Sequence, residues 1–378
     1  MVKRRVLVTF SSSQGPMFFG DRIRIVEILN ILKKSGYFEV VEAPLPMFTR
    51  WTLGKAIINM FPLRNRLVHI RSRIDILLWL GLNSSINSLK RIIRRTNPHV
   101  VLAETSLVGW ATTHVCKELY IPCIVDCHGL AFTEAKGAGY DNWRQLESLE
   151  RETFTKCDAL SVVSKRMKDY IQREFGISAD KMIITPNGSR PQPFAAQYAS
   201  PIKVIYAGTF AYWEKVHDFL EIAKKANQRF KFYMAGAGPL KEQLLERIDK
   251  EKIPMTYLGY ISRQKIFTTL SKMQIGIAPS TKDLARIVAS PIKVFDYMAS
   301  GLPVVTPRIG DWGDLVDIED CGMALDDDSI ENYLEALNIL ACRDTWNKKS
   351  LNALKVIEKK YSWDKVLQPL VNLIESYK

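Results

Sequence analysis

The strongest constraint on the fold is a regular alternation of short, Val- and Ile-rich apolar runs with stretches of helical periodicity along all 378 residues. Such runs are typical of parallel strands, because these are buried on both faces and connected by helices. The strands predicted in the first half are residues 6–10, 38–42, 100–104, 123–126 and 159–163. Those predicted in the second half are residues 203–207, 230–235, 255–258, 275–278 and 304–306. The pattern therefore predicts an α/β chain with two successive Rossmann-like domains.

A linker separates the two alternating regions. Residues 186–193, PNGSRPQP, hold three prolines and a glycine, a composition typical of linkers. The predicted domains are residues 1–186 and 187–361, followed by a helix, 362–378, expected to pack back on the first domain. In open parallel sheets, ligands bind beyond the carboxyl ends of the strands. We therefore expect a site in a cleft between the two sheets.

Positive charge is concentrated at the N-terminus. The chain has a net charge of +13, and residues 1–95, with 17 basic and 5 acidic side chains, contribute +12 of it. Residues 64–78 combine an apolar stripe at helical spacing with flanking arginines, Arg64, Arg66, Arg71 and Arg73. This pattern is typical of a helix lying on an anionic membrane, although a helix packed on the domain core with solvated arginines fits equally well. We expect no nucleic-acid partner, because no RNA-binding module is recognisable.

No apolar run in the sequence is long enough for a signal peptide or a membrane span, so we expect a cytoplasmic protein, peripheral on the membrane face. The six cysteines include no pair at CxxC spacing. Cys123, Cys127 and His128 could hold a metal, but buried reduced thiols are the favoured interpretation. We therefore predict no metal site.

Three segments have residues suited to binding a phosphorylated ligand. Gly236 and Gly238 follow a predicted strand and open a helix, where backbone N–H groups can approach a phosphate. Gly208 and Thr209 also follow a strand, and Lys215 opens the next helix. Taken singly, the first segment also fits a tight turn and the second a solvated lysine.

The third segment is the longest, residues 290–305, SPIKVFDYMASGLPVV. Lys293 and Asp296 are three residues apart and therefore neighbours on one face of a helix. A cation suits a diphosphate, and a carboxylate suits sugar hydroxyls. An ordinary surface salt bridge is the alternative interpretation.

In their order and spacing, these segments resemble the family 4 glycosyltransferases, which have the GT-B fold of two facing Rossmann-like domains with a cleft between them. The matching segments are residues 186–188, 208–215, 236–239, 258–260, 278–280 and 296–305, with weaker matches at 126–129 and 162–164. The resemblance implies retaining transfer of a hexose from a nucleotide diphosphate sugar, a UDP-sugar or GDP-sugar, with no metal or other cofactor required. It also implies that the second domain binds this donor and the first the acceptor, a glycan or a lipid-linked sugar.

The resemblance also assigns roles to particular residues. It implies that Lys215 and Lys293 hold the diphosphate, that Asp296 binds the ribose, and that His128 lies at the junction of donor and acceptor. His128 and Lys293 are the expected catalytic residues. The other expected donor-binding residues are Gly208, Thr209, Gly236, Gly238, Ser290, Pro291 and Ile292. The loop containing Gly15 and Pro16 is expected to shape the acceptor site.

Four positions depart from the family pattern. Val288 and Asp296 stand where the family usually has two glutamates, and Thr209 stands where many relatives have an arginine. Val216 stands where a glycine usually follows the phosphate-binding lysine. The resemblance and the basic N-terminal region together favour a glycosyltransferase acting on a lipid-linked or envelope glycan. The alternatives are a GT-B epimerase or phosphorylase and a non-catalytic sugar-nucleotide binder.

Overall fold

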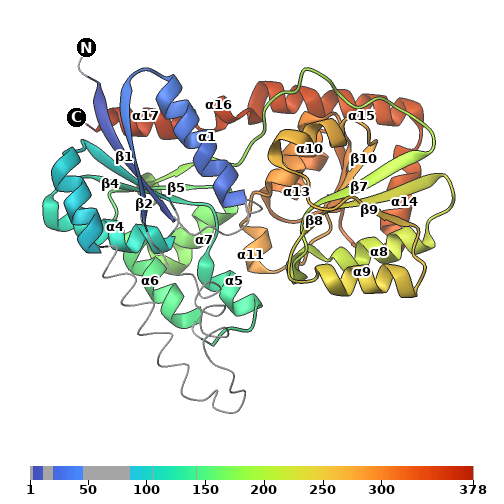
Figure 1. Cartoon of the computed structure of the whole chain (residues 1–378), viewed down its shortest axis with the longest axis horizontal. Coiled ribbons are helices and arrows are strands. Elements are labelled where there is room, and N and C mark those ends of the chain that lie inside the picture. Colours follow the sequence, from blue (N-terminus) through green and yellow to red (C-terminus); the bar gives the residue numbers. More distant parts are fainter. Residues whose placement is uncertain (1–2, 12–19, 46–85, 105, 142, 378) are drawn as a thin grey trace.

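The computed structural model describes residues 3–11, 20–45, 86–104, 106–141 and 143–377, which form two α/β domains side by side (Figure 1). Each domain contains a six-stranded sheet, and every strand pairing in it is parallel. The strand orders are β2-β1-β3-β4-β5-β6 and β12-β11-β10-β7-β8-β9. The predicted fold class, two Rossmann-like domains, is confirmed.

The first sheet is buried on both faces. Its strands are β1 Arg4–Ser11, β2 Phe38–Leu45, β3 Val100–Glu104, β4 Cys123–Cys127, β5 Ala159–Val162 and β6 Met182–Ile184. In β1, Val6 and Val8 pack on one side of the sheet, whereas Leu7 packs on the other. Successive strand side chains point to opposite faces, so burial of both faces requires the continuous apolar run seen in the sequence.

Helices cover both faces of this sheet. In the first domain they are α1 Gly20–Lys34, residues 86–96, α4 Ser106–Leu119, α5 Ala131–Gly137, α6 Trp143–Lys156 and α7 Lys165–Phe175. Apolar side chains of α1 form the core on the Val6 side, and those of α4, α6 and α7 form the core on the Leu7 side. None of the helices in the described ranges is long and apolar enough to cross a membrane.

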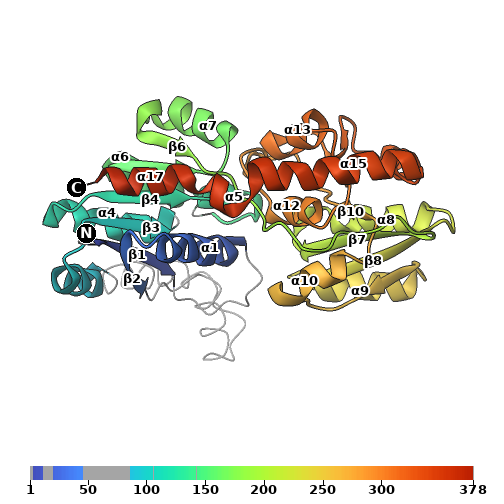
Figure 2. The same cartoon turned by 90° about the horizontal axis from the view of Figure 1, so that it is seen from above.

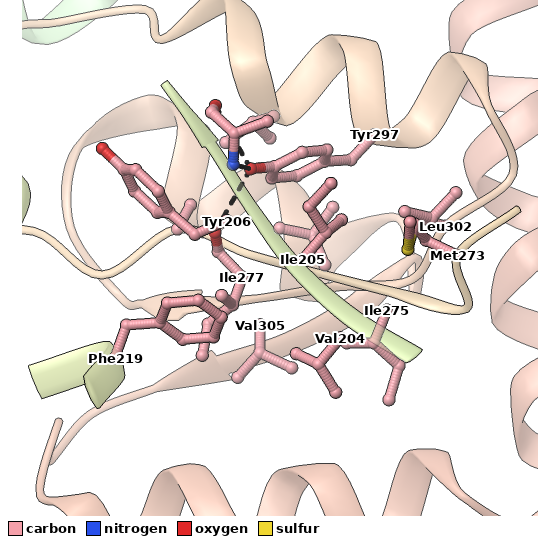
Figure 3. Packing of buried hydrophobic residues seen from close by; sticks show 14 of the residues in the cluster. Val204, Ile205, Tyr206, Phe219, Met273, Ile275, Ile277, Tyr297, Leu302 and Val305 are labelled. Carbon is pink, nitrogen blue, oxygen red and sulfur yellow. Dashed lines mark hydrogen bonds between the residues drawn. The ribbon is translucent and has the colours of Figure 1, made fainter. Parts of the chain in front are cut away.

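The second sheet has a single large core, part of which is drawn in Figure 3. Its strands are β7 Ile202–Thr209, β8 Phe230–Ala237, β9 Met255–Tyr257, β10 Ile275–Ile277, β11 Val304–Pro307 and β12 Gly322–Leu325. Its helices are α8 Val216–Lys225, α9 Lys241–Lys250, α10 Arg263–Leu270, α11 Leu284–Ile287, α12 Ile292–Ala299, α13 Gly310–Ile318, α14 Ile330–Leu340 and α15 Arg343–Val356. The edge strand β12 was not predicted, because it has no Val or Ile.

The end of the chain crosses from the second domain back to the first. After α15 and the π-helical turn Ile357–Tyr361 come α16 Trp363–Val366 and α17 Gln368–Ser376, which lies along the first domain (Figure 2). Leu370 and Ile374 of α17 are buried in the same core as α1. The linker, residues 186–193, is the other connection between the domains. It contacts the returning chain where the Ser189 N–H donates to the Tyr361 carbonyl at 3.0 Å.

Candidate active site

A pocket of about 280 Å³ lies between the two domains, at the carboxyl ends of strands from both sheets. Many of the predicted site residues line it, although they are far apart in the sequence. From the first domain comes the residue after β4, His128. From the second domain come Gly208, Thr209, Gly236, Ser290, Pro291, Ile292, Lys293 and Asp296. The structure therefore brings together nine of the residues singled out in the sequence.

Lys293 lies in the first turn of α12, and its side chain is only 12% exposed. Its ammonium forms an ion pair with Glu214 and lies 3.1 Å from the Tyr206 hydroxyl. Burial lowers the pKa of Lys293, and the Glu214 carboxylate opposes part of that effect. Burial also raises the pKa of Glu214, but Lys293 and Arg286 outweigh it and hold that pKa below its usual value. The pocket thus holds a desolvated cation beside a carboxylate.

Two glycines make room for this arrangement. A Cβ at Gly208 would lie 2.8 Å from the Lys293 ammonium nitrogen, which is closer than real side chains come. Gly236 has a φ of +137°, and a Cβ there would lie 1.9 Å from the Gly208 carbonyl oxygen. Any larger residue at either position would displace the lysine or the two strand ends.

Tyr297, one helical turn after Lys293, fixes α12 against the sheet (Figure 3). Its hydroxyl accepts a 2.7 Å hydrogen bond from the Ala207 N–H and lies 3.4 Å from the Ile277 carbonyl. Tyr297 is fully buried, so burial raises its pKa and the hydroxyl stays neutral. These contacts join α12 to the ends of β7 and β10, and thereby position Lys293.

Asp296 lines the pocket, but its carboxylate already has partners. Arg263 binds both carboxylate oxygens, and the Ser189 hydroxyl donates to one of them at 2.7 Å. Burial lowers the pKa of Arg263, but Asp296 outweighs this effect and the pKa lies above its usual value. The predicted neighbours Lys293 and Asp296 therefore do not pair with each other, and each has a partner from another element.

His128 is next to a buried ion pair. Its Nδ1 lies 3.9 Å from Asp126 Oδ2. The Arg24 guanidinium donates two 2.7 Å hydrogen bonds to the Asp126 carboxylate, and both side chains are 1% exposed. Burial by itself raises the pKa of Asp126, but Arg24 more than offsets this and holds it well below its usual value. His128 therefore has a permanent negative charge behind it.

Arg24 and Asn187 connect this ion pair to the second domain. Arg24 Nη1 donates to Asn187 Oδ1 at 3.0 Å. The Asn187 backbone N–H then donates to the Ser290 hydroxyl at 3.0 Å, and its side-chain amide donates to the Ser290 carbonyl at 2.6 Å. The linker thus fixes the segment before α12 relative to His128.

Two predicted donor-binding residues do not line the pocket. Lys215 lies 2.9 Å from Asp328 and 3.0 Å from Asp218, in the two ion pairs it forms. Gly238 has a backbone role, because a Cβ there would lie 2.4 Å from the Phe210 carbonyl oxygen. Gly15 and Pro16, and the patch of Arg64, Arg66, Arg71 and Arg73, lie outside the described residues.

Val288 does not face the pocket either. It is 1% exposed and packs in the hydrophobic core of the first domain, beside α5, α6 and α7. The Ser164 hydroxyl donates a 2.7 Å hydrogen bond to the Val288 carbonyl. The position where the family usually has a glutamate is therefore a contact between domains in this chain.

Ser164 also caps α7, because its hydroxyl oxygen accepts the Met167 N–H at 2.9 Å. Replacing Ser164 with alanine removes both the cap and the interdomain hydrogen bond, so we expect the free energy of unfolding to fall by about 1–2 kcal/mol. Ser329→Ala, which removes the cap of α14 alone, is the matched control and should cost less. Urea denaturation of both variants measures the difference, and an equal loss would contradict the interdomain role.

Cys123 and Cys127, the first and last residues of β4, are buried free thiols. Burial raises the pKa of Cys127 well above its usual value. No group of three His, Cys, Asp or Glu side chains suited to a metal occurs among the described residues.

The sequence analysis did not single out five charged residues that line the pocket: Arg24, Glu134, Glu214, Arg263 and Arg286. Their sequence signals are weak. Arg24 interrupts the apolar face of a helical stretch, and Glu214 directly precedes Lys215. Only the fold places Arg24 next to Asp126 and Glu214 next to Lys293.

Comparison with known proteins agrees with this geometry. Residues 40–192 match the family model described as Glycosyltransferase Family 4, and residues 201–342 match the one described as Glycosyl transferases group 1. An uncharacterised glycosyltransferase from Methanocaldococcus jannaschii is 22% identical over 295 residues, which cover 71% of this chain and 72% of that protein.

Two solved structures show the same fold. Sucrose-phosphate synthase from Thermosynechococcus elongatus has a TM-score of 0.80 at 14% identity, over 99% of both chains. HepE from Anabaena, solved in complex with UDP-glucose, has a TM-score of 0.71 at 11% identity, over 98% of this chain and 99% of HepE. The two family matches and the two parallel sheets show that the chain belongs to the family 4 glycosyltransferases and has the GT-B fold.

Proposed function

We propose that this glycosyltransferase moves a hexose, with retention of configuration, from a UDP- or GDP-sugar to a lipid-linked or envelope glycan on the cytoplasmic face of the membrane. The observation that carries the proposal is the buried Lys293 ammonium, which lines the pocket between the two domains at the start of α12. In this proposal the nucleotide sugar is the substrate, and no resident cofactor takes part.

The start of α12 suits a diphosphate. Ile292 and Lys293, its first two residues, both line the pocket. Free N–H groups at a helix N-terminus attract anions, and the ammonium adds a full positive charge. Negative charge develops on the diphosphate as the sugar leaves, so a preorganised cation stabilises the transition state more than the ground state. The UDP-glucose complex of HepE, which has the same fold, supports this choice of donor.

The other pocket residues suit the rest of the donor. Asp296 faces the pocket with a carboxylate whose oxygens have further lone pairs for ribose hydroxyls, although Arg263 and Ser189 already bind it. His128 lies across the pocket in the first domain, where we place the junction of donor sugar and acceptor. The Asp126 carboxylate behind it stabilises a protonated imidazole during transfer.

Charge supports the proposed acceptor and membrane. The first 95 residues contribute +12 of the net charge, and Arg91, Arg94 and Arg95 are exposed on the helix over residues 86–96. Arg24 is one of these 17 basic residues, but it is buried in its pair with Asp126 and does not contribute to the surface field. A basic first domain suits an acceptor carrying lipid phosphate in an anionic membrane.

A donor screen by thermal unfolding tests the proposal. At 100 times its Kd, a donor stabilises the folded state by about 2.7 kcal/mol, so we expect the Tm to rise by several degrees. UDP-glucose, UDP-galactose, UDP-N-acetylglucosamine and GDP-mannose would be compared. The double variant Lys293→Met with Glu214→Gln should show a smaller rise at the same concentration. A wild-type protein stabilised by none of these donors would contradict the proposed donor class.

A further inference from the structure

We propose that Arg286 is the second cation of the diphosphate subsite and binds the donor together with Lys293. This inference rests on the proposed function, since it assumes a nucleoside diphosphate in the pocket. It assigns a binding role to a residue that no sequence motif marks, and it removes that role from Lys215.

Arg286 and Lys293 come from different elements but meet at one carboxylate. Arg286 belongs to the short helix α11, and its Nη2 lies 3.7 Å from Glu214 Oε1. Lys293 belongs to α12 and pairs with the other carboxylate oxygen of Glu214. The side chains of Arg286 and Lys293 are 14% and 12% exposed, and both residues line the pocket. Two largely buried cations therefore flank one anion.

The charges of these three side chains do not balance. Two cations and one carboxylate leave a net positive charge in a desolvated wall of the pocket, and burying an uncompensated charge is costly. Arg286 contributes to the lowered pKa of Lys293, after burial and against the opposing effect of Glu214. An anionic ligand in the pocket supplies the missing negative charge.

Arg286 has hydrogen-bond donors left for such a ligand. A guanidinium has five N–H groups in a planar fork that suits phosphate oxygens. In the described part of the chain, the only side-chain hydrogen bond of Arg286 is from Nε to the Ser280 hydroxyl at 3.2 Å. This bond orients the guanidinium, and both terminal nitrogens keep their N–H groups.

The other candidates for a second cation are less suitable. Thr209 lines the pocket but carries no charge. Lys215 is held by both Asp218 and Asp328, so two carboxylates already compensate its charge. Arg24 and Arg263 line the pocket, but Asp126 and Asp296 bind them through two hydrogen bonds each. Among the arginines that line the pocket in the described part of the chain, Arg286 is thus the one whose terminal nitrogens form no hydrogen bond with a carboxylate.

The test is calorimetric titration of UDP and GDP into the wild type and into Arg286→Gln and Arg286→Lys. For the nucleotide that binds, we expect Arg286→Gln to weaken affinity by about 10- to 100-fold, the range for a charge-assisted hydrogen bond. Arg286→Lys should lose less, because it keeps the charge without the planar fork. Arg308→Gln, which removes a surface arginine paired with Asp317, is the matched control.

Lys215→Ala separates the two assignments of the second cation. Loss of affinity in Lys215→Ala but not in Arg286→Gln would overturn the inference and leave the proposed function standing. Unchanged affinity in both Arg286 variants would also overturn it. If the wild type binds neither UDP nor GDP, the proposed function itself fails, and this inference fails with it. The Tm of each variant without ligand verifies folding, and if Arg286→Gln is unfolded, the Lys variant alone decides.

Discussion

The double variant Lys293→Met with Glu214→Gln is expected to transfer sugar about 10²- to 10³-fold more slowly than the wild type. The lysine lies in the first turn of α12, where its ammonium faces the proposed diphosphate. Methionine keeps an unbranched side chain of similar size but cannot compensate charge on the departing phosphate. The main loss should therefore appear in kcat, because that charge grows as the bond to the sugar breaks.

Changing both partners removes one positive and one negative charge, so the net charge of the pocket stays the same. If Lys293 alone were removed, Glu214 would be left buried with its main partner gone, and the protein could lose stability for that reason. The matched control is Lys225→Met with Glu331→Gln, which removes an ion pair from the surface of the same domain. Steady-state kinetics with the donor found in the screen give the comparison. Equal rates in the wild type and the Lys293 double variant would rule out the proposed role of Lys293.

The second large effect concerns the free energy of unfolding and the buried ion pair between Arg24 and Asp126. We expect Arg24→Ala to lower the free energy of unfolding by about 3–5 kcal/mol, because it leaves the Asp126 carboxylate buried without its counter-charge. The same substitution also removes hydrogen bonds to Thr185 and Asn187. Arg173→Ala, which breaks an exposed pair with Glu174, should cost no more than about 1 kcal/mol. Urea denaturation of the two variants measures both values.

The pH dependence separates the ion pair from simple loss of packing. Because Arg24 holds the pKa of Asp126 below its unfolded value of about 3.9, the pair stabilises the protein fully above that pH. This contribution is lost as the pH falls from there toward the lower pKa of the folded state. The difference between wild type and Arg24→Ala should therefore narrow below about pH 4. A difference that stays constant at low pH would show that packing, and not charge, causes the loss.

Much of the fold could be predicted from the sequence, because the deciding pattern is local. A parallel strand buried on both faces needs a continuous apolar run, and β1, β3 and β7 all have one. Strand β12 lacks such a run, since its sequence is GMAL and two of its residues are only partly buried. It forms by pairing with β11 at the sheet edge, and that contact has no local signal.

The site could be predicted only in part, for a related reason. Residues at or just after the ends of strands, such as Gly208 and His128, are carried to the cleft by the fold itself. Arg24 and Asp126 are 102 residues apart, and Lys293 and Glu214 are 79 apart. No spacing rule relates such residues, so the partners of the predicted groups became visible only in three dimensions. The same holds for Arg286, whose importance depends on its position beside Glu214.

The most direct test of the account is transfer of a radiolabelled hexose from the donor found in the screen to membranes that contain lipid-linked acceptors. We predict that the wild type moves label into the lipid-extractable fraction, and that the variant Lys293→Met with Glu214→Gln does so at least about 100-fold more slowly. A wild-type protein that binds a nucleotide sugar but transfers no label to any lipid or glycan fraction would contradict the proposed transfer.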